Sequence, residues 1–191
     1  KENQIDRYED RLGTFLVQLS SRELSARDGN EISKLLHTIG DLERIGDHAV
    51  NLLDAAREKK EKGLRFSEQA ARELQVLLAA IADILDLTVR AFADNSVEFA
   101  RQVEPLEQVV DVLKSELRAR HIQRLKKGTC TIEMGFILSD LLTDLERVSD
   151  HCSNIAVCLI QTAESQFDTH DYLNRLKHSH QPQFHAAFEK N

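Results

Sequence analysis

The stretch DLERIGDHAVN at positions 41–51 returns as DLERVSDHCSN at positions 144–154, an offset of 103 residues. Seven of the eleven positions are identical, and six of those seven are charged or polar. A repeat that served only a hydrophobic core would keep its apolar periodicity and let its polar surface diverge. Internal duplication indicates a chain built from related structural units. The preserved polar residues indicate that each unit carries a site.

Few residues in this chain interrupt a helix. Its 191 residues include two prolines, seven glycines and no tryptophan. Apolar residues recur at intervals of three and four, which predicts an all-α protein of long helices. Pro105 is expected to kink the fourth helix or to divide it. The predicted helices cover residues 1–22, 31–62, 67–94, 97–126 and 131–164, with a weaker sixth around residues 172–176.

The duplication divides the chain into a helical domain of two units and a tail. The first unit covers residues 1–64, the second covers 66–164, and a short helix and tail follow over 165–191. The motif falls on the last of three helices in the second unit, but the first unit has only two. We therefore expect two pseudo-symmetric bundles of antiparallel helices, the first without its opening helix. Because Lys1 is no translation start, we expect a fragment whose missing helix lies upstream.

Charge and cysteine usage exclude several classes of protein. The net charge is −7, and the basic residues are interspersed with acidic ones, so nucleic acid is not an expected partner. Three cysteines without CxxC spacing are typical of a reduced, cytosolic protein. No apolar run approaches the roughly 20 residues needed to span a bilayer, so we expect this part of the protein to be soluble.

Acidic pairs spaced four residues apart mark the candidate site. Residues at this spacing lie on one helix face, one turn apart, and like charges there cost about 0.2–0.5 kcal/mol. A cation reverses that cost, and carboxylate clusters suit iron, manganese, zinc, magnesium or calcium. The sequence therefore predicts carboxylate metal sites. Their predicted ligands are Glu43, Asp47, Glu146 and Asp150 on the motif helices and Glu2, Asp6, Glu107 and Asp111 on the preceding helices.

The other polar residues of the motif are expected to support the site. Asp41 and Asp144 are spaced to form helix-surface ion pairs with the arginines three residues later. The histidines lie about 140° around the helix from the motif glutamates, which favours an orienting or packing role. The asparagines lie one turn beyond the aspartates, close enough to bind there as well. These supporting residues are Asn51, Asn154, His48, His151, Arg44 and Arg147.

Other readings of the acidic pairs remain open. A metal-free helical scaffold could bind a basic partner through its acidic faces. Di-iron carboxylate oxidases use Glu-x-x-His, but the third residue after each motif glutamate is Gly46 or Ser149. The chain also lacks a phosphate-binding loop and a GxSxG motif. Catalysis is not indicated, and a metal hydrolase or oxidase would need an open coordination position.

The duplicated E-R-[IV]-x-D block resembles the signature of the PhoU family. The stretches LLHTIGDLERIGDHAVN, VEPLEQVVDVL and DLERVSDHCSNIAV look like the cytosolic PhoU-like domain that follows the membrane part of bacterial sodium-dependent phosphate cotransporters. The resemblance covers nearly all of the chain to about residue 164. It implies three-helix bundles that hold acidic motifs over a multinuclear iron or other divalent metal site.

The same resemblance implies a regulatory role in phosphate uptake at the cytoplasmic face of the membrane. The partner it implies is the protein's own upstream transmembrane part or another membrane phosphate transporter. A further copy of the chain is a second class of partner. Carried over residue by residue, the family motif falls on Glu43 and Asp47 and on Glu146 and Asp150. Iron, zinc or manganese are the expected metals.

Overall fold

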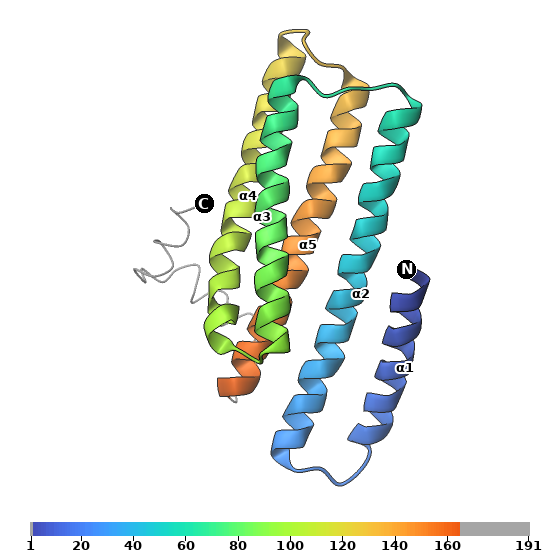
Figure 1. Cartoon of the computed structure of the whole chain (residues 1–191), viewed down its shortest axis with the longest axis vertical. Coiled ribbons are helices and arrows are strands. Elements are labelled where there is room, and N and C mark those ends of the chain that lie inside the picture. The colour runs from blue at the N-terminus through green and yellow to red at the C-terminus, as the bar shows by residue number, and fades with distance from the viewer. Residues whose placement is uncertain (1, 165–191) are drawn as a thin grey trace.

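The protein is an all-α bundle of five helices (Figure 1). The computed structural model describes residues 2–164, and the side chains of Glu2, Ala26 and Glu164 are left out of the description. The predicted sixth helix and the histidine-rich tail lie outside the described residues. The helices are α1 (Glu2–Ser20), α2 (Ala26–Glu61), α3 (Glu68–Ala93), α4 (Val97–Lys126) and α5 (Ile132–Glu164).

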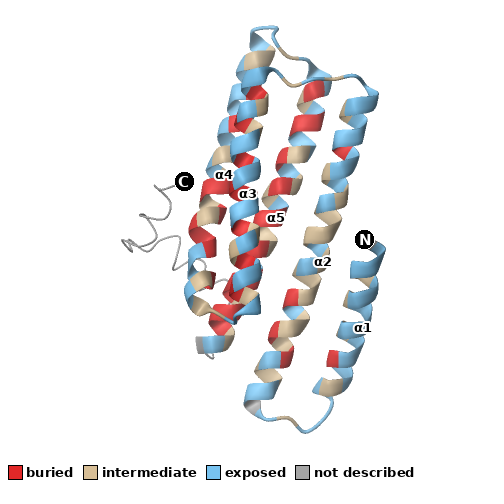
Figure 2. Ribbon diagram, viewed as in Figure 1, coloured by how far each residue is buried: buried red, intermediate tan, exposed pale blue. Residues whose placement is uncertain are grey.

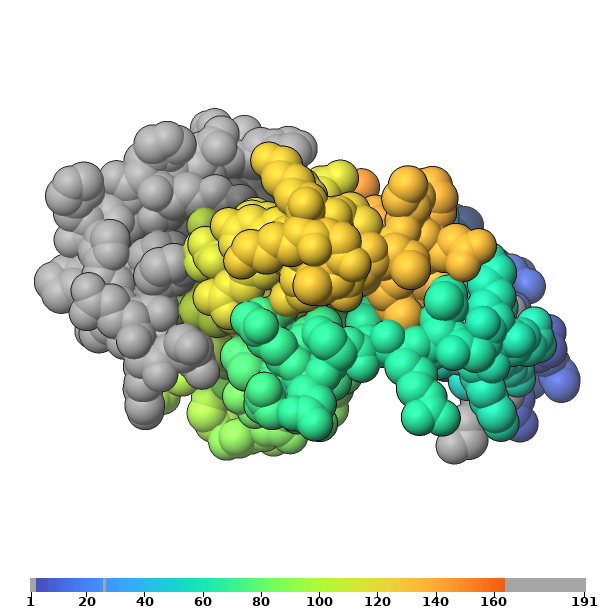
Figure 3. Space-filling model, turned by 90° about the horizontal axis from the view of Figure 1, so that it is seen from above, coloured from blue at the N-terminus to red at the C-terminus, as the bar shows by residue number. Residues whose placement is uncertain are grey.

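Helix α5 lies at the centre of the arrangement. It packs against α3 and α4 on one side and against α2 on the other, while α1 contacts only α2 among the described helices. Seen from above, the end of α2 lies beside the start of α5, away from the end of α4 (Figure 3). Gly46 lets α1 approach α2 closely, because a Cβ there would lie 3.0 Å from Cδ1 of Ile5.

Short polar residues set the helix ends. A serine hydroxyl accepts a backbone N–H at the start of α2, α3 and α4, which satisfies a donor that the helix itself leaves free. A residue with positive φ follows the end of the same three helices, where glycine or asparagine fits most easily. The capping serines are Ser25, Ser67 and Ser96, and the positive-φ residues are Gly63, Asn95 and Gly128.

The structure corrects the start of one predicted helix and excludes the division of another. Helix α2 begins at Ala26 rather than at residue 31, because the Ser25 hydroxyl accepts the N–H of Asp28 and starts the helix. Helix α4 continues through Pro105. Pro105 is itself buried, as are Val103 and Val109 on the same helix. Burial of the apolar ring offsets part of the cost of the hydrogen bond that a proline removes from a helix.

The core is concentrated in α3, α4 and α5 (Figure 2). Cys152 lies in it, and burial raises the pKa of its thiol to about 11. Of the two motif helices, α5 packs against α2, α3 and α4, whereas α2 packs against α1 and α5. Leu42 and Leu53 of α2 are 39% and 49% exposed, because no described helix covers α2 as α3 covers α5. None of the described helices has the length and apolar content of a membrane span.

Candidate metal centre

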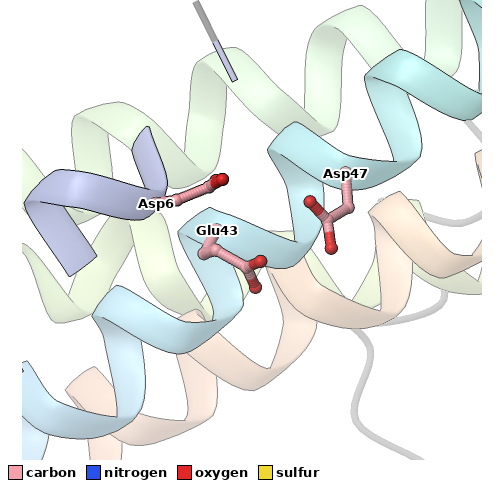
Figure 4. A group of neighbouring side chains, drawn as sticks. All are labelled: Asp6, Glu43 and Asp47. Carbon is pink, nitrogen blue, oxygen red and sulfur yellow. The ribbon is translucent and has the colours of Figure 1, made fainter. Parts of the chain in front are cut away.

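Three carboxylates from two helices come together near the middle of α2 (Figure 4). Glu43 and Asp47 project from successive turns of α2 and point toward each other, and Asp6 reaches toward them from α1. One ligand oxygen from each residue lies within 4.8 Å of the others. The i, i+4 spacing aligns the two α2 residues, and the close approach of α1 adds the third. Three of the predicted ligands are therefore assembled.

The electrostatics of this triad oppose three negative charges. Burial raises the pKa of Glu43 above its ordinary value, the charge of Asp47 and a hydrogen bond with it raise that pKa further, and Asp6 adds to the effect. Arg44 partly offsets the shift, but its Nε lies 3.7 Å from Glu43 and its side chain is 65% exposed. Oδ1 of Asp6 is buried without a hydrogen-bond partner among the described residues. The cluster is therefore short of positive charge and of donors.

A polar groove adjoins the triad between α1, α2 and α5. Its volume is about 550 Å³, and it is lined by Glu9 and Glu43 together with Arg44, His151 and Asn154. Solvent and small ions can therefore reach the side of the triad formed by Glu43. Hard oxygen donors beside an open polar groove match the chemistry of carboxylate metal sites.

The acidic residues of the second unit have other partners. Glu146 forms an ion pair with Lys114, and Oδ2 of Asp150 accepts a hydrogen bond of 3.2 Å from Nη1 of Arg147. Glu107 is 5% exposed and accepts a hydrogen bond from Gln108. Within residues 2–164, the second-unit carboxylates do not form a group with closely spaced ligand atoms.

The last two of the eight predicted ligands are Asp111 and Glu2. Asp111 is partly buried on α4. Glu2 opens α1, but its side chain is outside the description. The structure thus brings Asp6, Glu43 and Asp47 together, and among the described side chains their second-unit counterparts do not form such a group of three.

The histidines of the repeated motif join the two units. Nδ1 of His48 donates to Oδ1 of Asp144 at 2.8 Å, and Nδ1 of His151 donates to Oδ1 of Asp41 at 2.8 Å. The two imidazole rings stack at a centroid distance of 5.6 Å. All four side chains are less than 20% exposed. We call this reciprocal arrangement the histidine clamp.

The motif asparagines add to the clamp. Asn51 donates to Asp144 at 3.1 Å, and Asn154 donates to Asp41 at 3.3 Å. The predicted ion pairs of Asp41 and Asp144 with arginines on their own helices are therefore wrong. Antiparallel packing of α2 against α5 brings each aspartate to the opposite motif, where it accepts from two donors at once.

Two residues of the site were missed at the level of sequence. Lys114 on α4 pairs with Glu146, and Glu9 on α1 lines the groove beside Glu43. Extending the alignment of Glu2 and Asp6 with Glu107 and Asp111 by one turn would have paired Glu9 with Lys114. The opposite charges of Glu9 and Lys114 at aligned positions are the feature of the sequence that would have identified both residues.

The chain matches a known protein family over both copies of the repeated motif. The family described as PhoU domain matches residues 1–56 and 74–159. The "Phosphate-specific transport system accessory protein PhoU homolog 1" of Thermotoga maritima is 26% identical over 136 residues, and the match covers 70% of this chain and 58% of that protein. YjbB of Salmonella typhimurium, whose name assigns it provisionally to inorganic phosphate export, is 21% identical. That match covers 83% of this chain and 30% of YjbB.

A solved structure has the same fold. The crystal structure of PhoU from Pseudomonas aeruginosa aligns with a TM-score of 0.71 at 22% sequence identity. The alignment covers 86% of this chain and 82% of that one. The five helices therefore have a PhoU-like arrangement.

Proposed function

The chain belongs to the PhoU family, and from this premise we propose that it is a metal-binding regulatory domain that modulates phosphate transport. The names of its relatives support the link, since the Thermotoga maritima protein is an accessory protein of a phosphate-specific transport system. The match spans 58% of that protein's length. We propose a non-enzymatic role in which the domain changes the activity of a transporter.

The finer proposal is that the domain works at the cytoplasmic face of the membrane as part of a sodium-dependent phosphate cotransporter. The match to YjbB supports this arrangement, because most of this chain aligns with less than a third of that longer protein. The partner is then the transmembrane part of the same protein, or another membrane phosphate transporter. Further copies of the chain are an additional partner class.

The single observation that carries the metal proposal is the triad of Asp6, Glu43 and Asp47. Its all-oxygen donor set fits iron, manganese or zinc in carboxylate sites. Its surplus of negative charge and the buried oxygen of Asp6 fit a cation as well. A bound ion would supply positive charge beside the groove, where phosphate oxygens could bind.

The test is metal binding by the purified chain. After treatment with chelator, the protein is dialysed against Fe²⁺, Mn²⁺ or Zn²⁺ and its metal content is measured by elemental analysis. We expect metal in the unaltered chain and its loss in Glu43→Ala and Asp47→Ala. Asp54→Ala is the matched control, because Asp54 lies on the same helix and its side chain is 61% exposed. A metal-free protein whose stability ignores chelator would refute the proposal.

The same preparation tests the scaffold alternative. If acidic faces bind a basic partner without metal, binding to the transporter should fall steeply with salt and ignore chelator. If metal is required, chelator should abolish the effect. Phosphate uptake by cells that carry the full-length transporter with Asp47→Ala then measures whether the site regulates transport.

A further inference from the structure

Aligning the two units pairs each member of the triad with a residue of the same type. The offset is 105 residues between α1 and α4 and 103 residues between α2 and α5. One position next to the triad differs in sign, because Glu9 of α1 aligns with Lys114 of α4. The aligned pairs of like residues are Asp6 with Asp111, Glu43 with Glu146 and Asp47 with Asp150.

The position that differs in sign lies in the surroundings of the motif glutamate in both units. Glu9 lines the groove with Glu43, and Lys114 pairs directly with Glu146. The side chains of Glu43 and Glu146 are each 24% exposed, so they differ in their countercharge rather than in burial. Lys114 is only 22% exposed. Solvent therefore screens its ammonium group weakly.

The aspartates of the two motifs show the same inequality. Asp150 accepts a hydrogen bond from Arg147, but that side chain is 59% exposed, so Lys114 supplies the half-buried cation beside the second-unit motif. Asp47 instead lies beside Glu43 and Asp6, with one oxygen of each residue within 4.8 Å of the others. The two copies of the acidic motif therefore differ in their countercharge: Glu43 has the exposed Arg44 beside it, and Glu146 has the half-buried Lys114.

We infer that the chain loads metal in the first unit only, and that Lys114 is a built-in cation that occupies the corresponding place in the second unit. The ammonium group of Lys114 neutralises Glu146 and thereby replaces a metal ion. The inference deepens the proposed function and rests on it. It assigns Lys114 and Glu9 as the residues that decide which copy of the motif accepts metal.

The experiment measures Mn²⁺ bound to the whole chain by equilibrium dialysis and by calorimetric titration. Asp47→Asn should lose the bound Mn²⁺. Glu9→Lys should weaken Mn²⁺ binding by about 10- to 100-fold without removing a ligand, as changes around a metal site commonly do. Lys114→Glu should bind additional Mn²⁺, and it should restore binding when combined with Asp47→Asn. Lys126→Glu, the same charge change at an exposed position of α4, should behave as the unaltered chain.

Thermal unfolding supplies a second measurement. Lys114→Glu should lower the melting temperature in chelator, because it adds a negative charge beside Glu146, and Mn²⁺ should reverse that loss. If Lys114→Glu does not fold, Glu9→Lys decides, and unchanged Mn²⁺ affinity in that variant overturns the inference.

The remaining outcomes distinguish a failure of the one-unit inference from a failure of the proposed metal-binding function. If Asp47→Asn keeps part of the bound Mn²⁺ and Asp150→Asn loses that part, both units load metal, so the inference fails and the proposed function stands. If folded Lys114→Glu gains no Mn²⁺, the inference also fails. If no form of the chain binds Mn²⁺, the proposed metal function fails and the inference fails with it.

Discussion

Replacing Asp47 by asparagine isolates the charge repulsion inside the triad. The change keeps the size of the side chain and removes one of three clustered negative charges. Like charges four residues apart cost about 0.2–0.5 kcal/mol on an exposed helix. A third carboxylate and partial burial of Glu43 add to this repulsion and raise the cost toward about 1 kcal/mol. We therefore expect Asp47→Asn to stabilise the metal-free chain by about 0.5–1 kcal/mol at neutral pH, which raises Tm by about 1–4 °C.

The pH dependence of the same variant follows from the sign of the Glu43 shift. Because the pKa of Glu43 is raised in the folded state, the folded chain binds more protons than the unfolded chain between the two pKa values. Stability of the chelated protein therefore falls as pH rises from the unfolded pKa, near 4.5, through the folded one. Asp47→Asn should remove part of that fall.

Bound Mn²⁺ should make the unaltered chain more stable than Asp47→Asn, the reverse of their order in chelator. At a free Mn²⁺ concentration of about 100 times Kd, binding stabilises the unaltered chain by about 2.7 kcal/mol, and Asp47→Asn should gain none of this. The assay is thermal unfolding followed by far-ultraviolet circular dichroism, with chelator and with Mn²⁺. Asp150→Asn is the comparison, because it breaks an exposed ion pair with Arg147 and should cost about 0–1 kcal/mol. The reasoning is refuted if Asp47→Asn destabilises the chelated chain as much as Asp150→Asn does.

Two further predictions concern the bundle itself. Glu73 is 8% exposed and bonds Arg124 at 2.8 Å; burial alone would raise its pKa, but Arg124 brings it below the ordinary value. The stability that ionised Glu73 contributes is therefore complete above the unfolded pKa near 4.5, and it is lost as pH falls through the folded pKa. Glu73→Gln should cost about 1–3 kcal/mol of unfolding free energy at neutral pH and little in acid. Urea unfolding at both pH values measures this difference. Gly135→Ala should cost about 1–3 kcal/mol in the same assay, because its Cβ would lie 2.7 Å from Nε2 of His121. Gly40→Ala has open space around it and should stabilise the helix by about 0.5–1 kcal/mol; equal effects of the two glycine changes would contradict the packing described.

The helices and the acidic pairs could be predicted from sequence because both depend on local spacing. An i, i+4 pair such as Glu43 and Asp47 shares a helix face wherever that helix packs. The start of α2 was missed because Ser25 caps a stretch that contains Asp28 and Gly29, residues that composition associates with turns. In the structure the Ser25 hydroxyl accepts the N–H of Asp28, and this stretch forms the first turn of a helix instead of a loop.

Contacts between helices could not be predicted in the same way. Asp41 has an arginine at ion-pair spacing on its own helix, yet it accepts from His151 and Asn154 of α5. Which of these wins depends on the antiparallel register of α2 against α5, and no local pattern encodes that register. The position of Lys114 beside Glu146 depends likewise on how α4 packs against α5.

The histidine clamp also restricts how the two units can move. A slide of α2 along α5 breaks both His–Asp bonds together, because each helix supplies one donor and one acceptor. One helical turn, about 5.4 Å, from Asp41 the residues of α2 are His37 and Ile45, and neither can replace the carboxylate. A displacement of that size therefore loses the bond between His151 and Asp41. The clamp thus favours a single register of α2 against α5, and a signal that crosses it would have to move the two helices together.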